Sequence, residues 1–307
     1  MKDIYDILGE WRRRSRCQPN RPGRSHTLAT LVRVEGSSYR RPGARMLIWP
    51  DGKTIGSLSA GCLEEEVKLR AREVFETGEP ALISFDTRRR FGCAGRIDVL
   101  IEHAREKFFV DLAENLDARR LCFAITRFSD GKVGTRIAQF DHEQEQQHEL
   151  MQQIDPPIRL WIFGDGPDNI PFHSLGQLLG WEMNTFVDPN ALAFAPDRWT
   201  AAIVKSHNYG RDFAALRRLL PLNLRYVGLI GPRKRRDQLM NDLLEREIVV
   251  NAGFFAPAGL DLGAETPEEI ALAIVSEIQR VFAGASGESL RERKMSIHSP
   301  IKGALLA

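Results

Sequence analysis

The chain has 307 residues, 43% of them hydrophobic, which is enough for two domains that each bury a core of their own. Its 43 Lys and Arg residues nearly balance 41 Asp and Glu residues, and the formal charge of +2 argues against nucleic acid as a partner. The longest apolar runs, such as residues 160–163, are far shorter than the roughly 20 residues that span a bilayer, so no membrane span is predicted.

The cysteine pattern points to a reducing compartment. Cys17, Cys62, Cys93 and Cys122 lie far apart and form no Cys-x-x-Cys pair, which disfavours a disulfide framework and a structural zinc site. The opening segment lacks the apolar core of a secretory signal and carries acidic residues that are unusual in a mitochondrial presequence. We therefore expect a cytoplasmic protein that begins with an amphipathic helix.

The first half of the chain predicts a mixed α/β domain. Leu63, Val67, Ala71 and Val74 recur at three- or four-residue intervals, which predicts a helix that ends at Gly78. Strand-like runs surround this helix at residues 26–34, 45–49, 81–85, 97–101, 121–128 and 132–140.

A polar, glutamine-rich stretch closed by Pro156 and Pro157 predicts a linker, and we place the domain boundary near Pro157. Strand-like and helical segments alternate beyond it, which predicts a parallel sheet flanked by helices. The expected organisation is an N-terminal domain with its linker over residues 1–157, a parallel-sheet domain over 158–283 and a tail over 284–307.

A glycine turn opens the second domain. A strand-like run leads into Gly164 and Gly166, and Asp188 ends the next strand 22 residues after Gly166, the spacing at which a carboxylate reaches a ribose hydroxyl. The third fingerprint glycine is missing, and Pro171 interrupts the following helix start. The pattern predicts a Rossmann-like fold and leaves two alternatives open, a site for NAD(P) or a fold that binds another ligand or none.

Residues 34–48 are rich in groups that bind oxyanions. Glycine lets backbone amides approach a ligand, and arginine forks bind oxyanions bidentately, so the segment is a candidate cradle for a phosphate-bearing molecule. A solvated basic hairpin is the alternative. The candidate residues are Ser37, Ser38, Tyr39, Arg40, Arg41, Gly43 and Arg45.

Two cysteines lie among glycines. Cys62 follows Gly61 at a predicted helix start, where backbone dipoles would lower its thiol pKa, and Cys93 lies in a glycine-flanked turn between arginines. Both are candidate thiolates that face a ligand, and burial as small apolar side chains is the alternative. For Cys122, inside an apolar run, we expect burial.

Two further segments of the second domain follow strands. His207, Asn208 and Tyr209 come just after a strand-like run, and loops at the carboxyl ends of parallel strands line ligand crevices, so all three are candidate substrate contacts. Solvated side chains are the alternative. The basic run at residues 233–236 opens a helix after Gly231, as either a solvated face or an anion site.

Taken together, these segments resemble the XdhC/CoxI family of accessory proteins for xanthine dehydrogenase and related molybdenum hydroxylases. The resemblance extends over most of residues 1–282. The matching parts are residues 35–48, 56–64, 85–87, the glycine-flanked Cys93, and residues 161–168, 187–189, 206–212, 226–236 and 257–278.

The resemblance implies a mixed α/β domain followed by a Rossmann-like domain. It also implies a carrier, rather than an enzyme, that holds the molybdenum cofactor (molybdopterin with its metal) while a terminal sulfur ligand is installed. The implied partners are a xanthine dehydrogenase-type hydroxylase and a cysteine desulfurase or sulfurtransferase, and we expect a homodimer. On this view Arg40, Arg41 and Arg45 neutralise oxyanions, while Cys62 and Cys93 approach the molybdenum or its sulfur.

The chain departs from the family in three places. The segment before Cys93 is shorter and more basic, and the connection between residues 189 and 206 is shorter, which predicts the loss of part of the Rossmann sheet. Lys205 stands where small or apolar residues are usual. Two alternatives to the carrier remain open: an NAD(P)-dependent oxidoreductase with Asp188 at the ribose and His207 as acid or base, and a scaffold that docks a sulfurtransferase to the hydroxylase.

Overall fold

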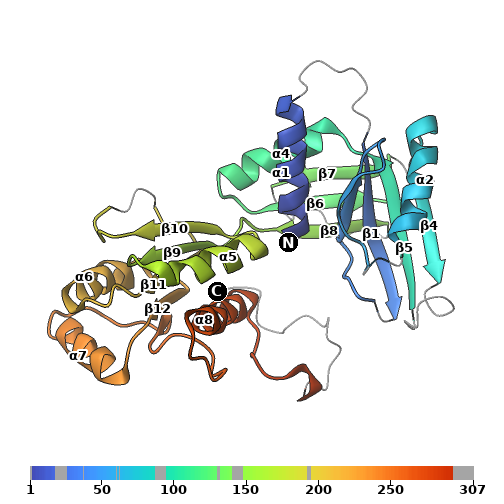
Figure 1. The fold of residues 1–307 in the computed structure, drawn as a ribbon. Coiled ribbons are helices and arrows are strands. Elements are labelled where there is room, and N and C mark those ends of the chain that lie inside the picture. Colours follow the sequence, from blue (N-terminus) through green and yellow to red (C-terminus); the bar gives the residue numbers. More distant parts are fainter. Residues whose placement is uncertain are drawn as a thin grey trace. The chain divides into compact units, whose positions relative to one another are not determined.

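The structure is a computed structural model that describes residues 2–17, 26–36, 38–59, 61, 63–86, 95–129, 132–139, 148–191 and 195–292. The chain forms two compact units, Met1–Pro156 (unit 1) and Pro157–Ala307 (unit 2), which are drawn in Figure 1. The predicted α/β class is confirmed, with mixed structure in unit 1 and a parallel sheet in unit 2.

Unit 1 is built on a five-stranded antiparallel sheet with the order β3-β2-β1-β5-β4. Its strands are β1 (Thr27–Gly36), β2 (Arg45–Ile48), β3 (Thr54–Gly56), β4 (Ala81–Asp86) and β5 (Gly95–His103). Alternate side chains point to opposite faces, and both faces of the central strands are buried.

Helix α2 (Glu64–Thr77) covers one face of this sheet. Its buried residues Val67, Ala71 and Val74 pack against Ala29 and Met46, as expected from their periodicity. The helix ends at Gly78, whose left-handed backbone allows its amide to bond to the Val74 carbonyl. The predicted helix and its end are therefore confirmed.

Helices α1 (Lys2–Cys17) and α4 (Glu106–Asp117) cover the other face together with a small antiparallel sheet of order β7-β6-β8. The strands of this small sheet are β6 (Cys122–Arg127), β7 (Gly134–Ala138) and β8 (Glu149–Ile154). The opening helix is confirmed, and Cys122 is buried as expected. The linker prediction is wrong for β8, because this polar segment pairs with β6 and buries Ile154.

Unit 2 is a parallel sheet of order β10-β9-β11-β12-β13 with helices on both faces (Figure 1). Helices α5 and α8 pack on one face, and α6 and α7 pack on the other. The strands are β9 (Arg159–Phe163), β10 (Glu182–Phe186), β11 (Thr200–Val204), β12 (Tyr226–Leu229) and β13 (Phe254–Phe255). The helices are α5 (Ile170–Leu179), α6 (Tyr209–Leu219), α7 (Arg233–Leu244) and α8 (Pro267–Ala283).

The strand order of unit 2 reverses at β9. The chain passes from β9 through α5 to β10 on one side, then crosses to β11 on the other side. The described part of that crossing, residues 187–191 and 195–199, contains no helix or strand. Open α/β sheets bind ligands at the carboxyl ends of the strands where the order reverses, which places the candidate crevice of unit 2 between β9 and β11.

Within the described ranges, no helix is both long enough and apolar enough to cross a lipid bilayer.

Candidate functional site

Three strands that precede predicted site residues in the chain end at the same end of the unit 1 sheet. β1 ends at Gly36, opposite Gly95 at the start of β5, and β4 ends at Asp86, opposite Arg96. β3 ends at Gly56, beside the start of β2. Because neighbouring strands are antiparallel, Gly36, Gly56 and Asp86 all lie at the same end of the sheet, which we call the loop end of unit 1.

The loop end is staggered. Arg45, the first residue of β2, lies opposite Thr30, so β1 runs six residues further, as far as Gly36. Ser37, Cys62 and Cys93 lie outside the described residues, and the predicted contact of the two cysteines with molybdenum stays a prediction.

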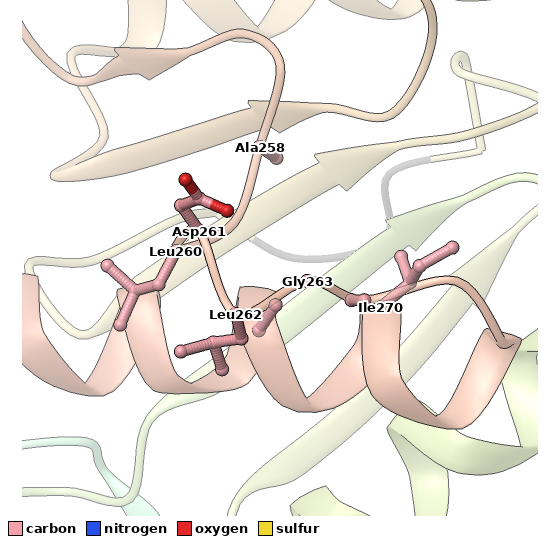
Figure 2. A pocket seen from close by; sticks show the side chains of 8 residues that line it. Ala258, Leu260, Asp261, Leu262, Gly263 and Ile270 are labelled. Carbon is pink, nitrogen blue, oxygen red and sulfur yellow. The ribbon is translucent and has the colours of Figure 1, made fainter.

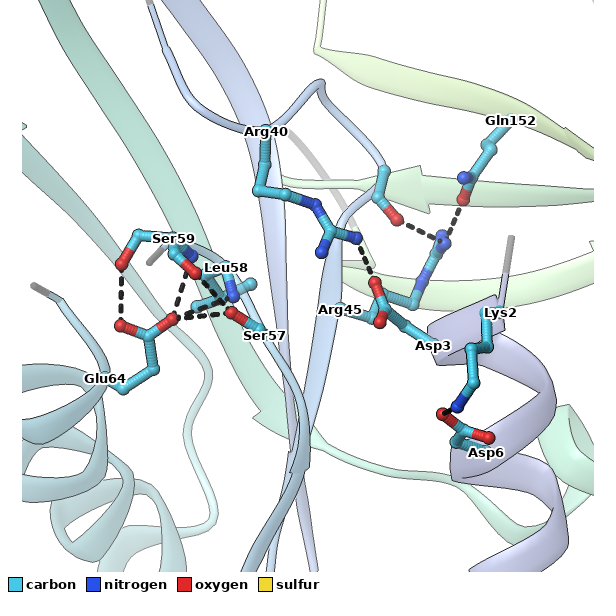
Figure 3. Close-up of polar contacts among 11 residues, drawn as sticks. Lys2, Asp3, Asp6, Arg40, Arg45, Ser57, Leu58, Ser59, Glu64 and Gln152 are labelled. Atoms are coloured by element: carbon cyan, nitrogen blue, oxygen red, sulfur yellow. Dashed lines mark hydrogen bonds and ion pairs between the residues drawn. The ribbon is translucent and has the colours of Figure 1, made fainter. Parts of the chain in front are cut away.

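The described part of the first loop presents an aromatic ring and a cation at the surface. The Tyr39 side chain is 67% exposed, Arg41 is exposed and Ser38 is half-buried. Arg40 turns back toward α1 and forms an ion pair with Asp3, as Figure 3 shows. Tyr39 and Arg41 are therefore the exposed members of the predicted cradle, and Arg40 is tied to the helix.

Arg45 belongs to the interior of unit 1. It is 1% exposed, and its guanidinium donates to Gln152 of β8, as Figure 3 shows. It also donates to the Gly43 carbonyl at 3.0 Å and to Thr126 Oγ1 of β6 at 3.4 Å. Burial lowers the pKa of Arg45 to about 10, partly offset by the charge of Glu102, so the group stays charged at neutral pH. The structure thus separates Arg45 from the exposed residues of the loop.

Gly43 also serves this interior contact. A Cβ atom there would lie 2.6 Å from the Gln152 side chain, so the missing side chain is what lets Gln152 reach Arg45. A polar chain continues from Thr126 through Thr135 Oγ1 at 3.0 Å to the Glu102 carboxylate at 2.5 Å. Burial raises the pKa of Glu102, although the hydrogen bonds from Thr135 lower it. Gly43 and Arg45 therefore hold the two sheets of unit 1 together.

The second loop, residues 57–63, is shaped by the carboxylate of Glu64, the first residue of α2. Oε1 accepts from Ser57 Oγ at 2.9 Å, from the Leu58 amide at 3.2 Å and from the Ser59 amide at 2.8 Å. Oε2 accepts from Ser59 Oγ at 2.6 Å and from the Leu63 amide at 3.1 Å. Figure 3 shows the serines turned toward this one side chain.

Partial burial raises the pKa of Glu64, but the hydrogen bonds from Ser59 and Ser57 outweigh it and bring the pKa to about 2. The carboxylate is therefore ionised throughout the physiological range. It also occupies three amides near the start of α2, those of Leu58, Ser59 and Leu63. In the sequence analysis, Glu64 is assigned no role in the site. Its place two residues after Cys62 is the sequence feature that could have indicated one.

The described residues contain no group of three or more His, Cys, Asp or Glu side chains placed to hold a metal ion. A pocket in unit 2 lies between residues 258–264 and the start of α8 (Figure 2). Its volume is about 250 Å³, and Asp261 is the ionisable side chain among its lining residues.

The glycine turn of unit 2 lies at the carboxyl end of β9. Gly164 follows the strand, and its amide donates to the Phe186 carbonyl at 3.0 Å, which ties the turn to the end of β10. Gly166 leads into a short 3-10 helix, Pro167–Asn169. A Cβ atom on Gly166 would lie 2.6 Å from Asp168 Oδ1, so the Asp168 carboxylate folds back over the glycine.

Lys205, at the carboxyl end of β11, completes this arrangement. Its side chain is 1% exposed, and its Nζ donates to Asn169 Oδ1 at 2.7 Å and lies 2.8 Å from Asp168 Oδ1. Burial raises the pKa of Asp168, but the hydrogen bond from Lys205 outweighs it and the pKa is lowered. In the sequence analysis, Lys205 and Asp168 are assigned no role. A charged residue directly after a buried strand, as Lys205 is, could have indicated a buried ion pair.

The predicted contacts His207 and Asn208 follow Lys205. His207 has a left-handed backbone, its side chain is 64% exposed, and its Nε2 lies 3.6 Å from Asp168 Oδ2. Asn208 caps α6 by accepting from the Arg211 amide at 3.0 Å. Asp188 is exposed just after β10 and accepts from the Asn190 amide at 2.8 Å.

The basic start of α7 is divided between two environments. Arg235 forms an ion pair with the fully buried Asp212 of α6, which also accepts from Ser206. Arg233 and Lys234 are exposed. The structure thus brings Gly164, Gly166 and His207 together at the carboxyl ends of β9 and β11, while Asn208 has a capping role.

Two family models match the chain. The XdhC and CoxI family model matches residues 20–86, and the XdhC Rossmann domain model matches residues 160–278. These matches fall in unit 1 and unit 2 and together cover more than half of the chain.

Individual proteins resemble the chain over most of its length. A Bacillus subtilis (strain 168) protein, named as a probable subunit of xanthine dehydrogenase, is 28% identical over 306 residues, covering 82% of this chain and 91% of its own. The molybdenum cofactor insertion chaperone PaoD from Escherichia coli (strain K12) is 24% identical over 289 residues, covering 84% of each chain. The crystal structure of a xanthine dehydrogenase from Bacillus halodurans matches with a TM-score of 0.74 and 26% identity over 90% of this chain and 94% of that one.

The two units, their order and the glycine turn of the parallel sheet agree with these matches. The resemblance inferred from residues 35–48, 56–64 and 206–212 is confirmed, and so is the Rossmann-like domain. The chain belongs to the XdhC and CoxI family.

Proposed function

We propose that this chain is an accessory protein that binds the molybdenum cofactor, supports its sulfuration and delivers it to a xanthine dehydrogenase-type hydroxylase. Its family supports this proposal, as does its similarity along most of its length to a protein named as a molybdenum cofactor insertion chaperone. The other two similar proteins are named as a xanthine dehydrogenase or as part of one. The molybdenum cofactor is cargo in this proposal, and the hydroxylase is its destination.

The observation that carries the proposal is that β1, β3 and β4, the strands that precede the three segments with predicted site residues, all end at the loop end of unit 1. The cofactor has a phosphate and a flat pterin at one end and a dithiolene-bound metal at the other. The exposed Tyr39 and Arg41 suit the first end, since an aromatic ring stacks on a pterin and a guanidinium binds a phosphate. Cys62 and Cys93, carried by the other two loops, would approach the metal or its sulfur.

The same proposal covers the partners. A sulfurtransferase or cysteine desulfurase supplies the sulfur ligand, the hydroxylase receives the finished cofactor, and the chain works as a homodimer in the cytoplasm. Arg40 keeps a place in the proposed cradle because its loop carries Tyr39 and Arg41, although its guanidinium is paired with Asp3.

The test uses purified chain incubated with the cofactor and then desalted, with bound pterin measured after oxidation to a fluorescent derivative. We expect Cys62→Ala and the double change Arg40→Ala and Arg41→Ala to retain at least tenfold less pterin than the unchanged chain. Arg70→Ala is the matched control, because Arg70 lies on α2 with its side chain 49% exposed. Full retention by both site variants would refute the assignment.

Delivery needs a second readout. Loaded chain should activate a cofactor-free hydroxylase faster than an equal amount of free cofactor does, and the site variants should lose this advantage. Equal rates with free and carried cofactor would restrict the function to storage.

The alternative of an NAD(P)-dependent oxidoreductase stays a prediction. It requires saturable binding of NAD or NADP that Asp188→Ala weakens, because the exposed Asp188 would hold the ribose. Calorimetry with both nucleotides decides between this alternative and the carrier.

A further inference from the structure

The glycine turn of unit 2 stands where Rossmann-type folds bind the pyrophosphate of a dinucleotide. In those folds the second glycine of the turn has no side chain, so that the pyrophosphate can approach the backbone closely. In this chain that place beside Gly166 is filled. The Asp168 carboxylate lies over the glycine, with Oδ1 at 2.6 Å from where a Cβ atom would stand.

The cation beside this carboxylate belongs to the chain as well. Lys205 Nζ lies 2.8 Å from Asp168 Oδ1 and 2.7 Å from Asn169 Oδ1, and the lysine side chain is 1% exposed. An ammonium group removed from water needs an anionic or strongly polar partner, because isolated burial of the charge is very costly. Asp168 is therefore the obligatory counterion of Lys205.

Asp168 also has an imidazole neighbour. Its Oδ2 faces His207 Nε2 at 3.6 Å, at the same carboxyl edge of the sheet. The neighbouring Asp165 is exposed and lies 3.8 Å from Arg211, so it does not compete for Lys205. One carboxylate thus sits between a buried ammonium and an exposed imidazole, in the position of a bound anion.

We propose that the Asp168 carboxylate is a built-in substitute for the ligand phosphate of this Rossmann-type turn. It occupies the anion cradle formed by Gly166 and Lys205 and so excludes the pyrophosphate of a dinucleotide. A pyrophosphate placed there would meet a carboxylate at close range and find Lys205 already paired, and both effects oppose binding. The cradle itself fits a phosphate group once the carboxylate is removed.

The experiment is a calorimetric titration of the full chain with inorganic phosphate, ADP, NAD and NADP. The unchanged chain should give no saturable binding at millimolar ligand. Asp168→Ala should bind inorganic phosphate and ADP at least tenfold more tightly, because it opens the space beside Gly166 and frees Lys205. The second change Lys205→Met in that background should abolish the gain. Asp165→Ala is the matched control in the same turn and should behave like the unchanged chain.

Asp168→Ala leaves a buried charge unpaired, so a second variant guards against loss of folding. Asp168→Asn keeps a side-chain oxygen near Lys205 but removes the negative charge, and its melting temperature should rise with phosphate concentration while that of the unchanged chain does not. Saturable binding of NAD or NADP by the unchanged chain, not strengthened in Asp168→Ala, would overturn the proposal. Equal phosphate responses in the unchanged chain and both variants would also overturn it. Pterin retention is measured separately, so this result stands apart from the proposed carrier function.

Discussion

The loop that leads into Cys62 depends on one carboxylate, and Glu64→Gln tests this dependence. Five donors from Ser57, Leu58, Ser59 and Leu63 converge on the two oxygens of Glu64. An amide in place of the carboxylate turns a donor toward Ser59 Oγ and the Leu63 amide and removes the charge. The variant should therefore loosen residues 57–63 while leaving the core of α2 intact.

The pKa of Glu64 gives the size of the effect. A fall from 4.5 to about 2 corresponds to about 3 kcal/mol of stability at neutral pH in the limit of no solvent screening. Because the side chain is only half-buried, we discount this to about 1–2 kcal/mol. For a unit of this size, the melting temperature of Glu64→Gln should fall by about 3–6 °C. The assay is thermal unfolding at pH 7 followed by circular dichroism.

Glu65→Gln is the control, because Glu65 is the neighbouring carboxylate, is 80% exposed and pairs with Lys68 at the surface. Glu65→Gln should lower the free energy of unfolding by less than about 0.5 kcal/mol. The folded pKa of Glu64 is depressed, so its contribution is complete above the unfolded value of 4.5 and is lost as pH falls toward about 2. Equal melting temperatures for the two variants at pH 7 would refute the reasoning. So would a difference between their melting temperatures that is as large at pH 2 as at pH 7.

Three further outcomes follow from the contacts of other side chains. Arg45→Ala should lower the free energy of unfolding of unit 1 by about 3 kcal/mol or more in urea unfolding, because Gln152 and the Gly43 carbonyl lose a buried partner. Arg41→Ala should change it by no more than about 0.5 kcal/mol. Similar losses in the two variants would contradict the assignment of Arg45 to the interior and Arg41 to the surface. The Cys122 thiol, whose pKa burial raises to about 11, should resist alkylation at pH 8 until the chain is unfolded, as peptide mass spectrometry can measure. Thr266→Ala removes the capping box of α8 and should cost about 1 kcal/mol in calorimetric unfolding, and an unchanged stability would mean that the cap contributes nothing.

Much of the fold was predictable because its signals are local. The apolar spacing of α2 and the alternation of strands and helices after Pro157 each need only a short window of sequence. β8 was missed because its signal is not local. It is polar along much of its length, it pairs with β6 more than twenty residues earlier, and Gln152 turns inward to meet Arg45.

The candidate site was predictable in part. Sequence reasoning grouped Arg45 with Arg40 and Arg41 because they are close in the chain, yet alternation along β2 turns Arg45 toward β6 and β8. The pairing of Asp168 with Lys205 spans 37 residues and depends on the register of β9 beside β11, where Phe163 lies opposite Val204. That register cannot be predicted from a short window of sequence, so the contact between the two charges is visible only in the folded chain.

The most direct test of the carrier function is the cofactor content of the protein as cells make it. The chain would be purified without oxygen from cells that synthesise the molybdenum cofactor, with pterin measured by fluorescence after oxidation and molybdenum by mass spectrometry. The proposal predicts pterin close to one per chain, and at least tenfold less in Cys62→Ala protein with an unchanged melting temperature. Folded protein that carries neither pterin nor molybdenum would contradict it.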